Sequence, residues 1–237
     1  MGIKVELVPG EFVEVDPDVS SVGGSFFYDP PRVYDPYPLE WTYNELKNQA
    51  EPVLYDVGAS SGCFTLLAAV IPELRVMAWE PTTPGYEFLI HNIVLNNLDQ
   101  RVQTFDSAIA DYKGSGWFNE VIDIGGLGCS MLGGVPFEGK ECCKVHKNVD
   151  TLDSWIGEAP PPTLIKIDTE GGELAVLLGA VQTIKLYHPV IVCEYEPLCT
   201  AQYGYHPELL VKMVSDLGYR CTIEGTNLFA EFKGDNR

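Results

Sequence analysis

The sequence predicts an α/β protein with a doubly wound, mostly parallel sheet and a C-terminal antiparallel hairpin. From residue 52 onward, short apolar runs alternate with segments of helical periodicity. Turns rich in glycine or acidic residues follow several of these runs, and two more apolar runs lie close together near the C-terminus. Alternation of this kind is typical of parallel strands joined by helices that cover both faces of the sheet.

The first half of this region predicts three strands and two helices. Residues 52–57 are apolar except for Asp56 and predict a buried strand, residues 58–62 a turn, and residues 63–71 a helix. The apolar face of that helix contains Cys63, Leu66, Leu67 and Val70. Residues 75–79 are the second strand, and Pro84 marks the first turn of the next helix, which the pair Asn96-Asn97 ends. Its apolar stripe contains Tyr86, Leu89, Ile90 and Ile93. Residues 102–105 are the third strand.

The second half predicts the rest of the sheet. A short helix is expected at 151–156, strands at 164–168 and 189–193, and a helix at 207–217 that Gly218 closes. The helix after residue 168 has one apolar side, formed by Leu174, Leu177, Leu178 and Val181. The hairpin pairs 219–223 with 228–232. The glycine-rich stretch 114–139 gives no clear pattern.

The first 50 residues differ from the rest, so we divide the chain into an N-terminal arm with a short helix, 1–50, and a main domain, 51–237. Frequent prolines argue against long helices in the arm. Thr42 and Glu45 have the spacing of a capping box and predict the start of its helix. The arm is also rich in aromatic residues, which either pack on the body or stack on a ligand: Tyr28, Tyr34, Tyr37 and Trp41.

Composition excludes several classes of partner. The chain has 34 acidic and 15 basic residues, a formal charge of −19, which disfavours binding to nucleic acid or to an anionic membrane. Its seven cysteines include no Cys-x-x-Cys pair, which favours a reducing compartment. The longest apolar run, 66–71, is too short to span a bilayer. Without a signal-peptide pattern, we expect a cytoplasmic location.

A nucleotide-binding constellation follows the first two strands. The segment Asp56-Val-Gly58-Ala59-Ser60-Ser-Gly62 joins the first strand to a helix, and its glycines allow the backbone to approach a ligand. Glu80 ends the second strand, where a carboxylate accepts hydrogen bonds from ribose hydroxyls. Ser60 interrupts the dinucleotide fingerprint, and Asp56 suits a positively charged cofactor. These features favour S-adenosylmethionine over NAD, although a tight turn with a solvated glutamate remains the structural alternative.

Several sequence blocks resemble the FkbM family of class I methyltransferases, which have a Rossmann-like fold. The blocks are Asp56–Thr65, Trp79-Glu-Pro81, Asn92 with Asn96-Asn97, Thr151-Leu-Asp153, Lys166-Ile-Asp-Thr-Glu-Gly-Gly-Glu173 and His188–Glu194. The resemblance implies S-adenosylmethionine-dependent O-methylation of sugar or natural-product hydroxyls. By position, Asp56, Gly58, Ala59 and Gly62 line the methionine end of the cofactor, and Ser60 belongs to the same loop. Glu80 holds the ribose, Pro81 lies next to the adenine, and Asp106, Ser107 and Ala108 bound its far side.

Three carboxylates at the ends of the fourth and fifth strands are the candidate catalytic groups: Asp168, Glu170 and Glu194. Converging carboxylates raise at least one pKa, which suits a general base for a hydroxyl. The same oxygens offer ligands for Mg²⁺, but we favour catalysis without a metal. Glu173 is either part of the site or only stabilises a helix start, and Lys166 is either catalytic or a structural partner of a carboxylate.

The sequence therefore favours an O-methyltransferase that acts on a carbohydrate hydroxyl. An NAD-dependent oxidoreductase and a catalytically inactive S-adenosylmethionine-binding module are the alternatives. The chain is either a separate cytosolic enzyme or one module of a longer glycan-assembling protein. The acceptor, the hydroxyl that is methylated and the oligomeric state do not follow from the sequence.

Overall fold

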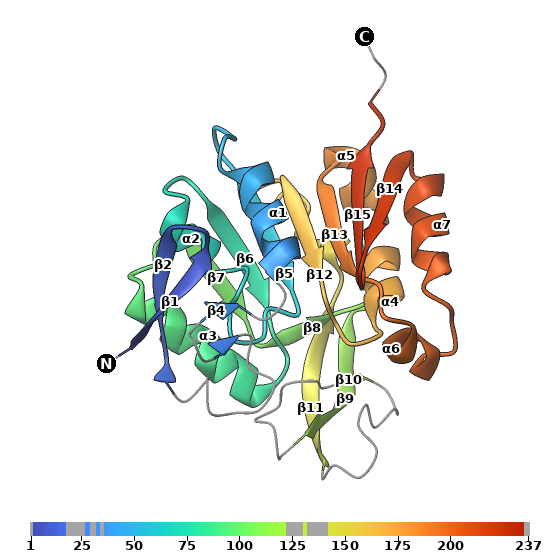
Figure 1. Cartoon of the computed structure of the whole chain (residues 1–237). Helices are drawn as coiled ribbons and strands as arrows, with labels where there is room; N and C mark the ends of the chain where they lie inside the picture. Colours follow the sequence, from blue (N-terminus) through green and yellow to red (C-terminus); the bar gives the residue numbers. More distant parts are fainter. Residues whose placement is uncertain are drawn as a thin grey trace.

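A seven-stranded sheet forms the centre of the computed structural model, which describes residues 2–17, 27–28, 32–33, 36–121, 130–131 and 142–234 (Figure 1). The strand order is β14-β15-β13-β12-β5-β6-β7. Five strands are parallel: β5 (Val53–Val57), β6 (Arg75–Trp79), β7 (Val102–Phe105), β12 (Leu164–Ile167) and β13 (Val190–Glu194). The hairpin β14 (Tyr219–Glu224) and β15 (Asn227–Phe232) joins β13 in antiparallel pairing. The predicted sheet and hairpin are confirmed.

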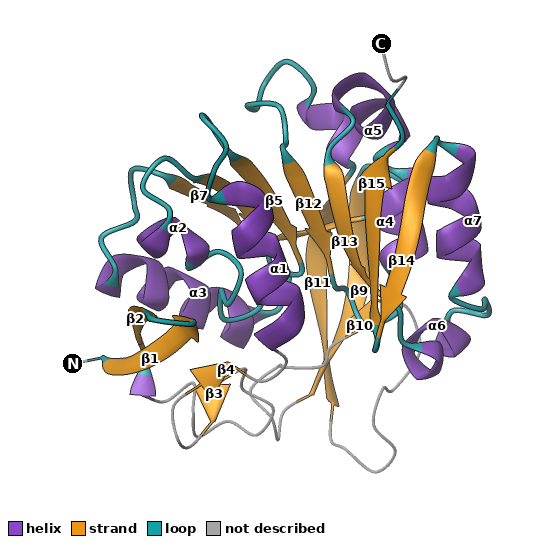
Figure 2. Ribbon diagram, turned by 45° about the horizontal axis from the view of Figure 1, so that its top comes forward, coloured by secondary structure: helices purple, strands orange, loops and turns teal. Residues whose placement is uncertain are grey.

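Both faces of the sheet are covered (Figure 2). Alternate strand residues point to opposite sides; Leu54 and Leu164 belong to one core cluster, Tyr55 and Ile165 to the other. The first cluster includes residues of α1 (Pro36–Leu46), α2 (Leu67–Val70) and α3 (Thr83–Leu95). The second includes residues of a 3₁₀ segment (Leu152–Trp155), α4 (Glu173–Leu178), α5 (Val181–Tyr187) and α7 (Glu208–Asp216). Helix α6 (Pro197–Gln202) follows the end of β13.

The N-terminal arm is not simply extended. It forms the antiparallel hairpin β1 (Ile3–Val8) and β2 (Glu11–Val15), which β4 (Arg32–Val33) and β3 (Phe27–Tyr28) extend to a four-stranded sheet. Valines at every second position are buried in the same cluster as α2 and α3: Val5, Val13 and Val15. Pro9 lies in the turn between the strands, so its missing N–H removes no ladder hydrogen bond.

The helix of the arm begins earlier than predicted. Helix α1 starts at Pro36, and Thr42 is buried in its interior, so the capping box at Thr42 and Glu45 is wrong. Pro36 and Pro38 fall in the first turn, where no intrahelical N–H bond is lost. The predicted stacking role of the aromatics falls partly outside the described side chains, at Tyr28 and Tyr34. Tyr37 and Trp41 both contact Phe229, with ring centroids 5.6 and 4.8 Å away.

Two other predicted helices are shorter than expected. Only Leu67–Val70 of the predicted helix 63–71 is α-helical, because tighter bonds between residues three apart, such as Leu67 N–H to Phe64 O, precede it. The helix after residue 168 is divided into α4 and α5 at Gly179, whose close approach to the Ala110 carbonyl leaves no space for a Cβ. Leu178 is consequently 48% exposed instead of facing the core.

A second sheet, which the sequence did not predict, lies beyond the carboxyl ends of β5 and β12 (Figure 1). It consists of β8 (Ser107–Ile109), β9 (Gly114–Val121), β10 (Ser130–Met131) and β11 (Cys142–Asp150), in the order β10-β9-β11-β8. The glycine-rich stretch thus begins with a strand, while 122–129 and 132–141 lie outside the described residues. Among the helices that are described, none is long and apolar enough to cross a membrane.

Candidate active site

The loop after β5 is held close to the end of β12. Gly58 has a φ of +76°, and a Cβ at this position would lie 1.8 Å from the carbonyl oxygen of Asp168. The amides of Gly58 and Ala59 both donate to the carbonyl of Trp79, at 3.0 Å each. Ser60 and Gly62 also have positive φ values, +50° and +95°. The loop is therefore a fixed backbone turn that only a residue without a Cβ permits at Gly58.

Glu80 joins this loop to the start of α3. Its carboxylate is buried and accepts hydrogen bonds from the amides of Ser60 (2.7 Å) and Thr82 (2.8 Å). Thr82 in turn caps α3 by accepting from the Gly85 amide. Burial raises the pKa of Glu80 more than these hydrogen bonds lower it. A carboxylate has about four lone-pair sites, so one that holds two amides can still accept ribose hydroxyls.

Lys166 is the cation at the centre of the site. It lies beside Asp56 in the register of β12 and β5, and its Nζ is 3.4 Å from Asp56 Oδ1 and 3.7 Å from Asp168 Oδ2. It donates to the Gly58 carbonyl at 2.6 Å. Burial alone would lower the pKa of Lys166, but the carboxylates of Asp56 and Asp168 outweigh it and raise the pKa. The lysine therefore links the loop after β5 to the carboxylates of Asp56 and Asp168.

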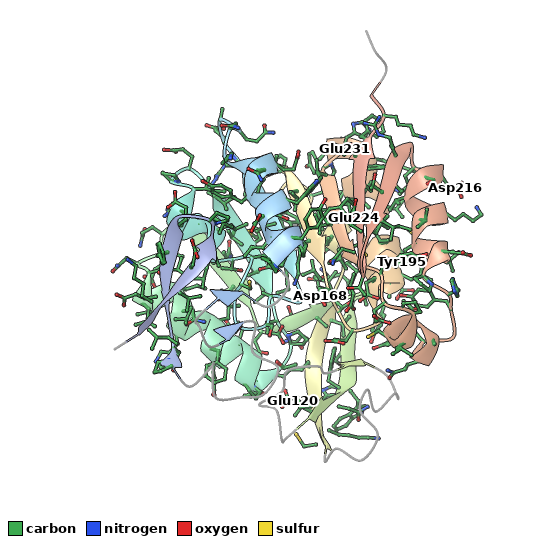
Figure 3. All side chains as sticks on the ribbon, in the orientation of Figure 1. Glu120, Asp168, Tyr195, Asp216, Glu224 and Glu231 are labelled. Atoms are coloured by element: carbon green, nitrogen blue, oxygen red, sulfur yellow. The ribbon has the colours of Figure 1, made fainter. Side chains whose placement is uncertain are left out.

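Asp56 and Asp168 differ in how open they are. The Asp56 side chain is fully buried, and its Oδ2 accepts from the Thr65 hydroxyl at 2.7 Å. The Asp168 side chain is 30% exposed. Figure 3 shows Asp168 at the end of β12 that faces the second sheet. Asp56 thus positions Lys166 and the loop, whereas Asp168 is open to a ligand that enters at this edge.

Glu170 and Glu194 lie together at the same edge, next to Cys199 of α6. One ligand atom from each of these three side chains lies within 4.8 Å of the other two. The Cys199 thiol donates to Glu170 Oε2 at 3.4 Å. Burial, and secondarily the charge of Asp168, raise the pKa of Glu170 to about 7. The same two causes raise the pKa of Glu194 well above its ordinary value. The structure thus brings the three predicted catalytic carboxylates to one edge.

Glu173 has a structural role. Its Oε1 accepts from the amides of Thr169 and Gly171 and from the Thr169 hydroxyl, all at 3.0 Å. The Tyr205 hydroxyl donates to its Oε2 at 3.2 Å. This buried carboxylate fixes the turn in which Glu170 has a left-handed φ of +56°. Of the two alternatives for Glu173, the structure supports the stabilising one.

The remaining predicted cofactor residues lie along the ends of β6 and β7. The Glu80 amide donates to the carbonyl of Phe105, which directly precedes Asp106. Asp106 forms an ion pair with Lys147 of β11 at 2.7 Å, and its side chain is 49% exposed. Ser107 and Ala108 begin β8, and Ala108 is buried. Pro81 is partly exposed beside Glu80. These residues border the site, and their contact with a cofactor stays a prediction.

Residues 56–221 match the model of the methyltransferase FkbM domain. The chain belongs to the FkbM methyltransferase family. This result favours a methyltransferase over the oxidoreductase alternative. It also agrees with the strand order, in which the loop at Gly58 and the acidic turn at Glu170 face each other across the neighbouring strands β5 and β12.

Relatives of this FkbM-family chain agree with this assignment. The hexuronic acid methyltransferase AglP of Haloferax volcanii is 25% identical over 184 residues, which are 78% of this chain and 70% of that protein. The crystal structure of methyltransferase FkbM from Methylobacillus flagellatus has a TM-score of 0.53 at 19% identity; the match covers 79% of this chain and 47% of that one. This chain thus spans about half the length of that protein.

A second solved structure shares the fold. The precorrin-6Y C5,15-methyltransferase of Geobacter metallireducens has a TM-score of 0.53 at 13% identity, with 95% of this chain and 96% of that chain covered. At such low identities, both structures support the fold alone. The FkbM-family chain therefore has the class I, Rossmann-like methyltransferase architecture that the sequence predicted.

Three residues of the site were missed or underestimated from the sequence. The sequence leaves Lys166 open as catalytic or structural and assigns no role to Thr65 or Cys199. Cys199 follows Glu196-Pro197, a combination that favours a helix start: Glu196 caps α6 by accepting from the Leu198 amide at 3.0 Å. That signal places a helix directly after β13 and brings Cys199 to the acidic edge.

Proposed function

We propose that this chain is an S-adenosylmethionine-dependent O-methyltransferase that acts on a hydroxyl of a sugar or glycan. The supporting observation is the carboxylate of Glu80, which is buried at the end of β6 and bonded to the amide of Ser60 in the loop after β5. This is where a ribose and the adjoining amino-acid part of the cofactor would be bound. The family supports methyl transfer.

The charges of the site fit a cationic methyl donor. Two carboxylates, those of Asp56 and Asp168, form ion pairs with the one ammonium of Lys166, and the carboxyl groups of Glu170 and Glu194 lie at the same edge. A sulfonium and an ammonium group would supply part of the missing positive charge, whereas the pyrophosphate of NAD would add negative charge. The electrostatics therefore favour S-adenosylmethionine over a dinucleotide.

Transfer to a hydroxyl requires an in-line attack on the sulfonium methyl and removal of the hydroxyl proton. The acceptor oxygen must lie about 3–3.5 Å from the methyl carbon. We assign the base to Asp168, because its partly exposed carboxylate lies at the edge where the acceptor would enter. Glu170 and Glu194 are the alternative bases at the same edge. Asp168→Asn should bind cofactor normally but turn over slowly.

The sugar acceptor is supported by the relative that methylates a hexuronic acid. On the second sheet, Trp117 of β9 is 58% exposed and its ring contacts that of His146, with centroids 4.9 Å apart. An exposed indole is a flat surface on which a sugar ring can pack. Mass spectrometry of reactions with oligosaccharides, free sugars and phenols tests the acceptor class. Trp117→Ala should raise KM for a sugar acceptor without changing cofactor affinity.

Calorimetry with S-adenosylhomocysteine tests the cofactor. Glu80→Gln should weaken binding by about 10- to 100-fold, because a charge-assisted hydrogen bond contributes about 1.5–3 kcal/mol. Glu87→Gln is the matched control, since Glu87 is exposed on α3, the helix that follows Glu80. An analogue without ribose hydroxyls should lose affinity in the wild-type protein and much less in Glu80→Gln. Binding of NAD alone, or equal losses in both proteins, would contradict the assignment.

A further inference from the structure

Within the described part of the chain, Glu170 and Glu194 form no ion pair with a basic side chain. Lys166 is the nearest cation among the described residues, but it already contacts Asp56, Asp168 and the Gly58 carbonyl. Glu194 Oε2 is enclosed and has no hydrogen-bond partner. An enclosed carboxylate oxygen without a donor is costly, and native structures usually satisfy such groups. No described residue donates to Glu194 Oε2, so a bound cation would satisfy this oxygen.

The spacing of the three side chains suits a metal ion. The Cys199 Sγ to Glu170 Oε2 distance is 3.4 Å, and one ligand atom of Glu194 lies within 4.8 Å of both residues' ligand atoms. Zinc has ligand distances of about 2.3 Å to sulfur and about 2.0–2.2 Å to carboxylate oxygen, so its tetrahedral ligands are about 3.3–3.7 Å apart. Small side-chain movements would bring all three ligands into this range.

We propose that Glu170, Glu194 and Cys199 form a binding site for a thiolate-accepting divalent cation such as Zn²⁺. The sulfur ligand distinguishes this site from a magnesium site, which requires oxygen ligands. The ligands come from three separate segments: the turn after β12, the end of β13, and helix α6. Three protein ligands leave one tetrahedral position open, as in catalytic zinc sites. Asp168 is outside the ligand set and remains the proposed base.

Cobalt titration of the reduced, chelator-treated full chain tests the proposal, because Co²⁺ reports both a thiolate ligand and tetrahedral geometry through its absorption. We expect saturable binding of one equivalent with a thiolate-to-cobalt band that Zn²⁺ abolishes and excess Mg²⁺ does not. Cys199→Ala should lose the band, and Glu194→Gln should bind at least about tenfold more weakly. The control is Cys221→Ala, which should bind cobalt normally. Its thiol is partly buried on β14 and donates to the Val211 carbonyl of α7.

Other outcomes would overturn the proposal. A band that persists in Cys199→Ala, or that disappears in Cys143→Ala, would place the thiolate elsewhere. Unchanged cobalt affinity in Glu194→Gln, or cobalt binding without a thiolate band, would also contradict the proposed ligand set. The titration contains neither cofactor nor acceptor, so it is independent of the proposed methyl transfer. If Cys199→Ala still binds S-adenosylhomocysteine, the variant is folded. If the cofactor proposal itself fails, a near-native unfolding curve serves as the test that the variant is folded.

Discussion

Replacing Lys166 with methionine should destabilise the protein strongly. Methionine has a similar length but no charge, so the variant leaves the fully buried Asp56 without its cation and the Gly58 carbonyl without its donor. Breaking a buried ion pair by removing one partner costs about 3–5 kcal/mol. Because the pKa of Lys166 is raised, its contribution is fully present below the ordinary lysine pKa of about 10.4 and is lost only above it. Urea unfolding at pH 7 therefore measures the whole effect.

Lys212→Met provides a matched control. Lys212 is 2.6 Å from Asp216, closer than Lys166 is to Asp56, but both residues of this pair are exposed on α7. Figure 3 shows Asp216 on that helix. An exposed pair of this kind contributes at most about 1 kcal/mol. Adding Asp56→Asn to Lys166→Met should recover part of the lost stability, because it removes the uncompensated charge. If Lys166→Met and Lys212→Met lose the same free energy of unfolding, burial does not strengthen the pair of Lys166 and Asp56.

Two further variants test the loop and the acidic edge. Gly58→Ala should lose at least about 2 kcal/mol more than Gly204→Ala in urea unfolding: both glycines have a left-handed φ (+76° and +77°), but only Gly58 has a backbone atom in the way. Equal losses would show that the contact with Asp168 relaxes freely. At pH 8 in the presence of chelator, the free energy of unfolding of Glu170→Gln should exceed that of the wild-type protein by up to about 3 kcal/mol. A folded-state pKa of about 7 against an ordinary 4.5 means that the wild-type protein loses stability as pH rises between these values. In thermal unfolding, Glu170→Gln should therefore be only slightly more stable than the wild-type protein at pH 5. An equal gain in stability at pH 5 and pH 8 would refute the raised pKa of Glu170.

Much of the fold could be predicted because it depends on local pattern. The apolar runs at 53–57, 75–79 and 164–167 are buried strands on both faces, and such strands have a distinctive composition. The second sheet could not be predicted in this way. Its strands β9 and β11 are partly exposed and pair across a long separation, so neither has a strong periodic signal.

The site was predictable in part for a similar reason. Residues at strand ends, such as Glu80 and Asp168, could be placed at one edge from topology alone. The roles of Lys166 and Glu173 could not, because they depend on whether a side chain turns into the core or toward solvent. Lys166 alternates with isoleucines on β12. This pattern places it on one face of the sheet but does not predict which residues it contacts.

Asn92 of α3 and Asn96, the residue that directly follows this helix, connect the N-terminal hairpin to the rest of the protein. Asn92 Oδ1 accepts from the Asp16 amide while its Nδ2 donates to the Ser61 carbonyl, and Asn96 exchanges hydrogen bonds with the backbone of Glu14. A fragment cut to the family-matched region 56–221 would lose these partners and leave apolar helix surface uncovered. Expression work on this protein should therefore keep residues 2–17, even though they lie outside the region that defines the family.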